Sequence, residues 1–185
     1  MTSEYISVMP EKAYKLINSG SLILACTSNS RNESNIAPIA WCTPVEYDPV
    51  TKLLFVCDIS HYTFKNVEET RQVIIAIPHV SQLKIVKDTG SCSGRNINKF
   101  EKFSIDSQKG KRSDILVPSS CIAYLECEVY NIVIDEEVGI IFCRVMEAYV
   151  RKGAFNNRLL AEKEEGKAIH HLGGNSFITT SDILL

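Results

Sequence analysis

Apolar and polar residues follow one another in short runs along this chain, a pattern that predicts many strands and few helices. Near the start, residues 10–20 fit one short helix, because a proline begins and a glycine ends a segment with apolar residues at helical spacing. Beyond it, apolar or alternating runs between turn-forming residues are typical of strands. Strands are predicted at residues 22–27, 36–45, 53–58, 73–77, 122–134 and 140–150.

Two further helices and one loop complete the predicted pattern. Residues 66–72 are polar enough for a short exposed helix, and the charged stretch that begins at Ala161 is a second helix candidate. Residues 104–114 are expected to form a surface loop. Their basic residues lack the interleaved aromatic side chains of a nucleic-acid site.

The two long C-terminal strands are predicted to pair as a hairpin. Acidic residues and a glycine at 135–139 suit its turn. Leu125, Cys127 and Val129 alternate with Glu126, Glu128 and Tyr130, which predicts a sheet with one buried face. Because the strands are not separated by regular ten-residue helices, the pattern favours a closed or partly closed antiparallel barrel over a parallel α/β sheet.

The composition is that of an ordinary globular protein, and the 185 residues fit one domain spanning 1–185. Twenty Lys and Arg against 22 Asp and Glu give a net charge of −2, so no global field recruits nucleic acid or an anionic membrane. No apolar run reaches the roughly 18 residues that span a bilayer, and the N-terminus lacks a basic region followed by an apolar one. A cytoplasmic protein is therefore expected.

The seven cysteines are predicted to be reduced. They are odd in number, contain no Cys-x-x-Cys pair, and mostly lie inside apolar stretches, so they are typical of core residues. A structural zinc or other metal site is not expected, because closely spaced ligand pairs are missing. Cys92 differs from the rest because it lies in a polar loop with a glycine.

Four separated segments carry the residue types of one binding site. Thr63 and Asn66 stand where a polar helix follows an apolar strand, a position at which a hydroxyl and free N–H groups receive a phosphate; plain N-capping by Thr63 is the alternative. Lys99 suits a phosphate as a point charge, whereas Arg95 either does the same or ties down its loop. The segments are residues 35–41, 61–66, 93–100 and 170–175.

The remaining candidates are an aromatic residue and a C-terminal motif. Trp41 offers a stacking face and one N–H donor to a ring system, although a core aromatic is the alternative. His171 is a candidate ligand contact, and Gly173 and Gly174 are expected to end the preceding helix. No catalytic triad, dinucleotide fingerprint or P-loop can be assembled. If the chain is an enzyme, its chemistry therefore belongs to a cofactor.

The order of these motifs resembles that of the flavin reductase-like family of FMN-binding split-barrel proteins, including its flavoredoxin branch. The resemblance is carried by five segments that cover most of the chain. They are the Asn-x-Ala-Pro strand at 35–41, the Tyr-Thr-x-x-Asn-Ile segment at 62–67 with Val67 in its last position, the Gly-Arg loop at 94–101, Leu-Glu-Cys at 125–127 and Leu-Gly-Gly at 172–174.

This resemblance implies a six-stranded antiparallel Greek-key split β-barrel that forms a homodimer with one FMN per subunit at or near the interface. Asn35 and Trp41 would contact the isoalloxazine, Thr63 and Lys99 the phosphate, and Asn66 and Arg95 would support the phosphate region. His171, Gly173 and Phe177 would close over the cofactor. Ala37, Pro38 and Ala40 complete the implied cofactor-binding set.

Three positions depart from the family pattern. Ala40 stands where a serine is common, Asn98 where an aspartate is usual, and Ala76 where an asparagine often ends the strand. These departures bear on flavin affinity and tuning more than on the fold.

The activity that the resemblance implies is that of an FMN-dependent oxidoreductase. It would take electrons from NADH, NADPH or another donor and pass them to a flavin, iron or protein acceptor. The alternatives are an FMN-binding electron carrier or flavin-storage protein without reductase activity, and a flavin-free barrel that serves as a structural or interaction module.

Overall fold

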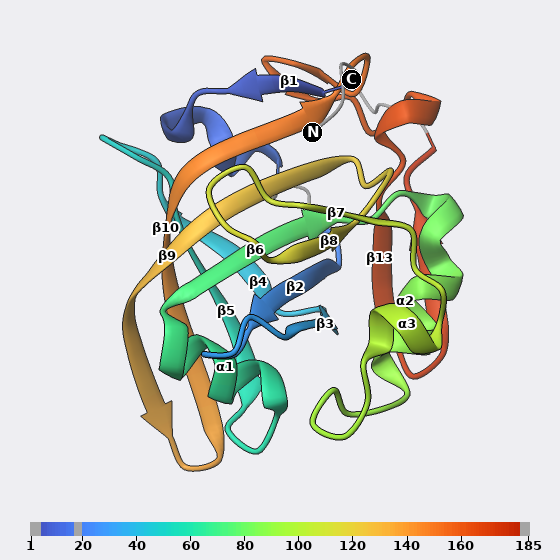
Figure 1. Cartoon of the computed structure of the whole chain (residues 1–185). Coiled ribbons are helices and arrows are strands. Elements are labelled where there is room, and N and C mark those ends of the chain that lie inside the picture. The colour runs from blue at the N-terminus through green and yellow to red at the C-terminus, as the bar shows by residue number, and fades with distance from the viewer. Residues whose placement is uncertain (1–4, 17–19, 182–185) are drawn as a thin grey trace.

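The computed structural model describes residues 5–16 and 20–181 and is mainly β (Figure 1). Eight strands form one antiparallel sheet, with the hydrogen-bonding order β3-β2-β6-β9-β10-β5-β4 and β1 added to β10. The predicted mainly β split barrel is confirmed, with eight strands in its sheet. These strands are β1 (Tyr5–Val8), β2 (Ile23–Ser28), β3 (Ser34–Ile39), β4 (Cys42–Glu46), β5 (Lys52–Asp58), β6 (Gln72–Ile77), β9 (Ala123–Asp135) and β10 (Val138–Arg151).

The sheet curves round on itself because its two ends are consecutive in the chain. β3 and β4 stand at opposite ends of the strand order, yet only Ala40 and Trp41 separate them. The prediction of one continuous strand at 36–45 is therefore wrong. The chain leaves one edge of the sheet after Ile39 and joins the other edge at Cys42, which an uninterrupted apolar run does not reveal.

The inner face of the barrel holds the main core. Along β5, Leu53, Phe55 and Cys57 are buried while the residues between them are half-buried, as expected for a strand with one face toward the core. On β9, Leu125, Cys127 and Val129 likewise belong to this core, as predicted.

The prediction of a single buried face fails for part of the sheet. A second apolar cluster, which includes Leu24, Ile74 and Tyr124, covers the other face of β2, β6 and β9. Glu126 is therefore buried rather than solvent-facing, and its two carboxylate oxygens accept hydrogen bonds from the N–H groups of Lys111 and Arg112 at 2.6 and 2.9 Å.

Short helices cover one side of the barrel. The helix α1 (Tyr62–Thr70) begins four residues before the predicted 66–72 and packs on β2 and β3. The helices α2 (Leu83–Gly90) and α3 (Lys99–Lys102) lie against β3. The described residues also form three 3₁₀ helices, η1 (Pro10–Leu16), η2 (Val80–Gln82) and η3 (Glu164–Gly166). The predicted N-terminal helix is thus a 3₁₀ helix over Pro10–Leu16, and its predicted continuation through residues 17–19 lies outside the described residues.

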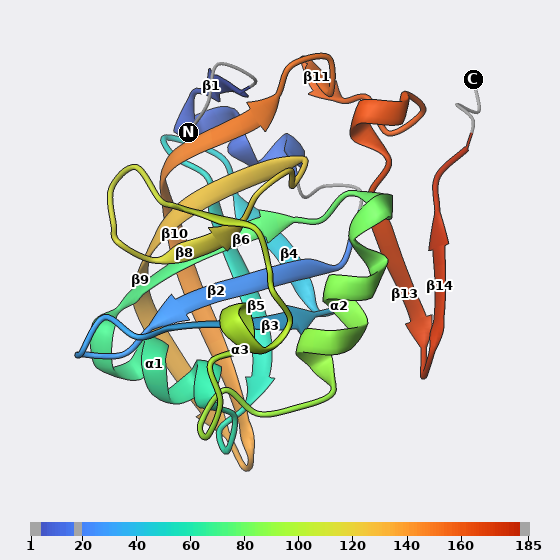
Figure 2. The same ribbon diagram turned by 45° about the vertical axis from the view of Figure 1, so that its right-hand side comes forward.

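The C-terminal region differs most from its prediction. In place of a helix from Ala161, the chain forms only η3 and then the hairpin β13 (Ile169–Gly173) and β14 (Ser176–Thr179), which stands beside α2 in Figure 2. A Cβ atom at Gly166 would lie 2.2 Å from the carbonyl oxygen of Leu160, so the chain folds back tightly here instead of continuing as a helix. The two glycines predicted to end that helix lie at the turn of the hairpin, with φ of 115° at Gly173 and 56° at Gly174.

The remaining short strands pair locally. One of them, β7 (Ser107–Lys109), lies inside residues 104–114, so the prediction that this whole segment is a loop is wrong. None of the described helices combines the length and the apolar composition needed to cross a bilayer. The short strands are β7 (Ser107–Lys109), β8 (Leu116–Pro118), β11 (Phe155–Asn156) and β12 (Arg158–Leu159).

Candidate functional site

A cavity of about 530 Å³ lies beside β3, between the start of α1 and the segment that joins α2 to α3. We call it the β3 cavity. It brings together residues that are distant in the chain, as the sequence predicted. Five of the predicted site residues line it: Asn35, Ala37, Pro38, Thr63 and Lys99.

The start of α1 forms one end of the β3 cavity. His61 occupies the N-cap position, and its side chain makes no capping hydrogen bond. N-capping by Thr63, the alternative considered from the sequence, is therefore wrong, because Thr63 is the second residue of the helix. The first N–H groups of a helix have no partner within it and carry partial positive charge, so this end of the cavity suits an anion.

Asn35 and Thr63 form a buried pair at this end. Nδ2 of Asn35 donates to Oγ1 of Thr63 at 3.2 Å. The Asn35 side chain is 2% exposed, and within the described residues its Oδ1 has no hydrogen-bond partner. A buried amide oxygen without a partner costs free energy, and a ligand that donates a hydrogen bond to it would remove that cost.

Lys99 places a buried positive charge on the cavity wall. It is 4% exposed, and its Nζ donates to the carbonyl oxygens of Ile36 at 2.8 Å and Thr89 at 2.6 Å. Over the part of the chain that the structure describes, Lys99 makes no ion pair. Burial lowers the pKa of Lys99, while the nearby Cys92 opposes that shift. An ammonium has three donors, so one remains for an anionic ligand.

A second cavity, of about 320 Å³, lies between α2 and the C-terminal hairpin β13–β14; we call it the hairpin cavity. Ala40, His171 and Phe177, all predicted site residues, line it. Pro38, Gly90 and Ser91 line both cavities, so the two spaces adjoin along β3 and the end of α2.

Four predicted residues lie outside the two cavities. Trp41 is 73% exposed, so the alternative of a core aromatic is wrong. Asn66 is fully buried and donates to Oγ1 of Thr27, which ties α1 to β2. Arg95 donates to the carbonyl oxygen of Ser60 at 2.8 Å and so holds its loop against the segment before α1. Gly173 lies at the hairpin turn, where a side chain would meet no neighbour within 4 Å.

Several lining residues were missed from the sequence. Thr89, Gly90 and Ser91 end α2 and line the β3 cavity, and a Cβ atom at Gly90 would lie 3.0 Å from Cγ of Pro38. The signal for them is a run of small residues after an amphipathic segment, which carries neither the charge nor the aromatic ring typical of a ligand contact. Tyr62, which belongs to the Tyr-Thr motif but was not a predicted site residue, lines the same cavity.

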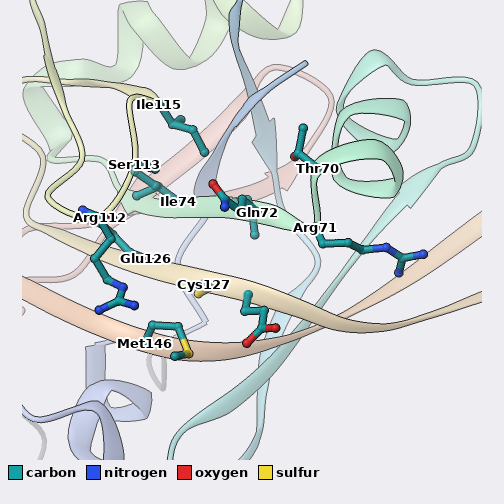
Figure 3. A pocket seen from close by; sticks show the side chains of 12 residues that line it. Thr70, Arg71, Gln72, Ile74, Arg112, Ser113, Ile115, Glu126, Cys127 and Met146 are labelled. Carbon is teal, nitrogen blue, oxygen red and sulfur yellow. Dashed lines mark hydrogen bonds between the residues drawn. The ribbon is translucent and has the colours of Figure 1, made fainter. Parts of the chain in front are cut away.

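A further cavity, of about 270 Å³, lies between β6, β9 and the residues 112–115 (Figure 3). None of the predicted site residues lines it. The buried carboxylate of Glu126 is already bound by backbone N–H groups, and the side chain of Arg71 extends away from the other labelled side chains. The candidate site is therefore the β3 cavity.

Comparison with known proteins gives one consistent result. Residues 16–170 match the family model described as the flavin reductase like domain. The protein YddH of Escherichia coli (strain K12) is 29% identical over 182 residues, which is 96% of each chain.

Solved structures with a similar fold come from the same group of FMN-binding proteins. An FMN-binding domain of a flavin reductases-like enzyme from Shewanella baltica OS155 superposes with a TM-score of 0.86 at 22% identity, covering 98% of this chain and 96% of that one. Flavoredoxin from Methanosarcina acetivorans gives a TM-score of 0.77 at 19% identity, with 89% of this chain and 86% of that one covered. The chain therefore belongs to the flavin reductase-like domain family.

Proposed function

We propose that this protein binds FMN in the β3 cavity and acts as a flavoprotein oxidoreductase. The observation that carries the proposal is the meeting of three groups at one cavity. The residues at the uncapped start of α1 line it together with Lys99 and with Asn35, whose Oδ1 has no hydrogen-bond partner among the described residues. Together they match a ligand that carries a phosphate and several hydrogen-bond donors.

The residues present fit FMN in size and chemistry. The β3 cavity has the volume of a typical cofactor site, and a Cβ atom at Gly94 would fill part of it, 1.9 Å from Oδ1 of Asn35. Thr63 and Lys99 would bind the phosphate, while Asn35 would hold Thr63 in place and accept from the ligand. Asn66 and Arg95 would support this end by fixing α1 and the Gly94 loop.

The ring would lie along residues 37–41 and end at the border between the β3 cavity and the hairpin cavity. Ala37, Pro38 and Ala40 supply small side chains there, and the exposed Trp41 lies at the end of this run. His171, Gly173 and Phe177 belong to the hairpin that would cover this side. The resemblance implied that Asn35 contacts the isoalloxazine. Because Asn35 donates to Thr63, we propose that it also contacts the phosphate end of FMN.

Bound FMN would supply the redox chemistry, with NADH, NADPH or another donor reducing it and a flavin, iron or protein acceptor reoxidising it. The protein's part is to bind and orient the cofactor. The free state of all seven cysteines supports a reducing, cytoplasmic location.

The first experiment is to ask whether the purified protein takes up FMN. We expect a yellow protein that releases FMN on denaturation. Thr63→Ala and Lys99→Ala should each weaken FMN binding about tenfold or more, since one charge-assisted phosphate contact contributes about 1.5–3 kcal/mol. Lys102→Ala, an exposed lysine on the same short helix as Lys99, is the control and should keep wild-type affinity. A colourless protein that ignores added FMN would refute the proposal.

A second experiment separates a reductase from an electron carrier. The FMN-loaded protein is mixed with NADH or NADPH without oxygen, and the flavin absorbance is followed. Rapid bleaching supports the reductase, whereas a flavin that stays oxidised supports the carrier or storage protein.

We further propose a homodimer formed through the outer face of β4, β5, β10 and β9. Val56, Ile140 and Val133 are register partners on neighbouring strands and so share one face, and the carbonyl oxygen of Trp41 accepts from the N–H group of Val56. Trp41 is 73% and Val133 44% exposed, so this face is an apolar surface.

The oligomeric state of variants tests this interface by light scattering. Val133→Glu should give a monomer. Ile6→Glu, which changes an isoleucine of similar exposure on β1, should leave a dimer. A dimer in both variants would refute this choice of face.

A further inference from the structure

We propose that the hairpin cavity is the substrate subsite and that it takes a planar apolar molecule with one negative charge, such as an aromatic carboxylate. The inference rests on the proposed function, because it places FMN in the adjoining β3 cavity. Pro38, Gly90 and Ser91 line both spaces, so a molecule in the hairpin cavity would lie next to a ligand in the β3 cavity.

The walls of the hairpin cavity are mainly apolar. Leu22, Pro38 and Ala40 come from the barrel, Val86 from α2, and Phe177 from the hairpin. The rings of His171 and Phe177 lie 5.1 Å apart at an interplanar angle of 42°, so they present aromatic surface to a bound molecule. Such walls select a flat hydrophobic body rather than a sugar or a peptide backbone.

The charge at the cavity is positive. Nζ of Lys87 lies 5.5 Å from the ring centroid of Phe177, and none of the described residues that line the cavity is acidic. The neighbouring carboxylate of Asp88 pairs with Lys84 at 2.5 Å, and Lys87 makes no ion pair within the described ranges 5–16 and 20–181. An unpaired ammonium beside an aromatic wall attracts the carboxylate of an aromatic ligand.

Two matched probes separate the contribution of the charge from that of the apolar walls. The FMN-loaded protein is titrated with 2-naphthoate and with the neutral 2-naphthamide, and heat of binding is measured. Wild-type protein should bind the naphthoate more tightly. Lys87→Met should weaken naphthoate binding about threefold to tenfold and change naphthamide binding by less than about twofold. Lys65→Met, an exposed lysine on α1, should change neither affinity.

Each result decides the proposal. If Lys87→Met weakened the binding of both probes equally, the proposal that Lys87 selects an anionic ligand would be overturned. A wild-type protein that bound naphthoate no more tightly than naphthamide would overturn it as well. Naphthoate that displaces FMN would overturn the placement of the subsite, because the two ligands would then compete for one space.

The test also keeps this inference apart from the proposed function. FMN binding is measured first and on its own. If FMN does not bind, the proposed function fails, and the same titrations on the flavin-free protein test the cavity. Naphthoate binding that depends on Lys87 would then support the anionic ligand class, and its absence would overturn it.

Discussion

Gly94 approaches Asn35 so closely that a Cβ atom on residue 94 would lie 1.9 Å from the Asn35 Oδ1. Only glycine leaves this amide in its place, where it also donates to Thr63. The close approach links the loop before α3 to the start of α1 across the β3 cavity.

Gly94→Ala should therefore displace the Asn35 amide and weaken FMN binding at least about tenfold. The overpacking should also lower the free energy of unfolding by about 1–3 kcal/mol. Chemical denaturation and FMN titration measure the two effects. In an Asn35→Ala background the clash is removed, so Gly94→Ala should then cost much less stability. Equal losses in both backgrounds would contradict this account.

Because Lys99 is buried, we expect the stability of the flavin-free protein and its affinity for FMN to change in opposite directions as the pH rises. The pKa of Lys99 lies below the ordinary 10.5 because burial removes the ammonium from water. Between the lowered pKa and 10.5 the unfolded chain binds more protons than the folded chain, so the free energy of unfolding of the flavin-free protein should rise with pH. FMN affinity should fall over the same interval, since the phosphate prefers the charged lysine.

Lys99→Met is the control for this prediction, because it keeps the length of the side chain without its charge. The difference between wild type and variant isolates Lys99 from other groups that titrate in alkali. A wild-type FMN affinity that follows the same pH curve as the variant would show that Lys99 does not face the phosphate.

Cys92 offers a chemical reporter of the cavity. It is half-buried and lines the β3 cavity. Burial raises the pKa of the other six thiols, to about 12 at Cys42, Cys57 and Cys121, which leaves little thiolate for reaction. Iodoacetamide at pH 8 should label Cys92 first, and saturating FMN should slow that labelling. Mass spectrometry of tryptic peptides measures both rates.

The control for this prediction is Cys92→Ser, which should lose the fast-labelling site. Unchanged labelling of Cys92 in the presence of saturating FMN would place the flavin elsewhere.

Glu126 should matter for stability rather than for the site. Its buried carboxylate accepts from the N–H groups of Lys111 and Arg112, and an amide in its place turns one acceptor into a donor. Glu126→Gln should lower the free energy of unfolding by about 1.5–3 kcal/mol. The exposed Glu128→Gln, two residues along the same strand, should change it little. Thermal unfolding of both variants decides between this role and a solvated one.

The strands β2, β5, β6, β9 and β10 were predictable because each buries at least one face. Their apolar residues recur with period two or in continuous runs, as along Leu53, Phe55 and Cys57. The strand β1 was not predicted, and β4, which has no buried residue, was not separated from β3. The hairpin β13–β14 was not predictable in this way. Most of its residues are half-buried or exposed, so no apolar alternation marks it. The charged segment that precedes it, from Ala161, has a composition typical of a helix.

The candidate site was predictable in its members but not in its geometry. Motif order pointed to Asn35, Thr63 and Lys99, which the fold brings to one cavity. No local pattern indicates that Lys99 is held by two carbonyl oxygens, since these belong to Ile36 and Thr89 on other elements. The exposure of Trp41 likewise depends on where the chain crosses between sheet edges.

The two-residue junction between β3 and β4 limits how a ligand can enter. Three Cα–Cα steps of 3.8 Å keep the Cα atoms of Ile39 and Cys42 within about 11 Å, so the edges of the sheet cannot part. The barrel therefore acts as a fixed frame at this point. The cavity walls that do not belong to its sheet include residues 91–94 at the β3 cavity and the hairpin β13–β14 at the hairpin cavity. A flavin that enters or leaves would pass these segments, so we expect their opening to set the rate of exchange.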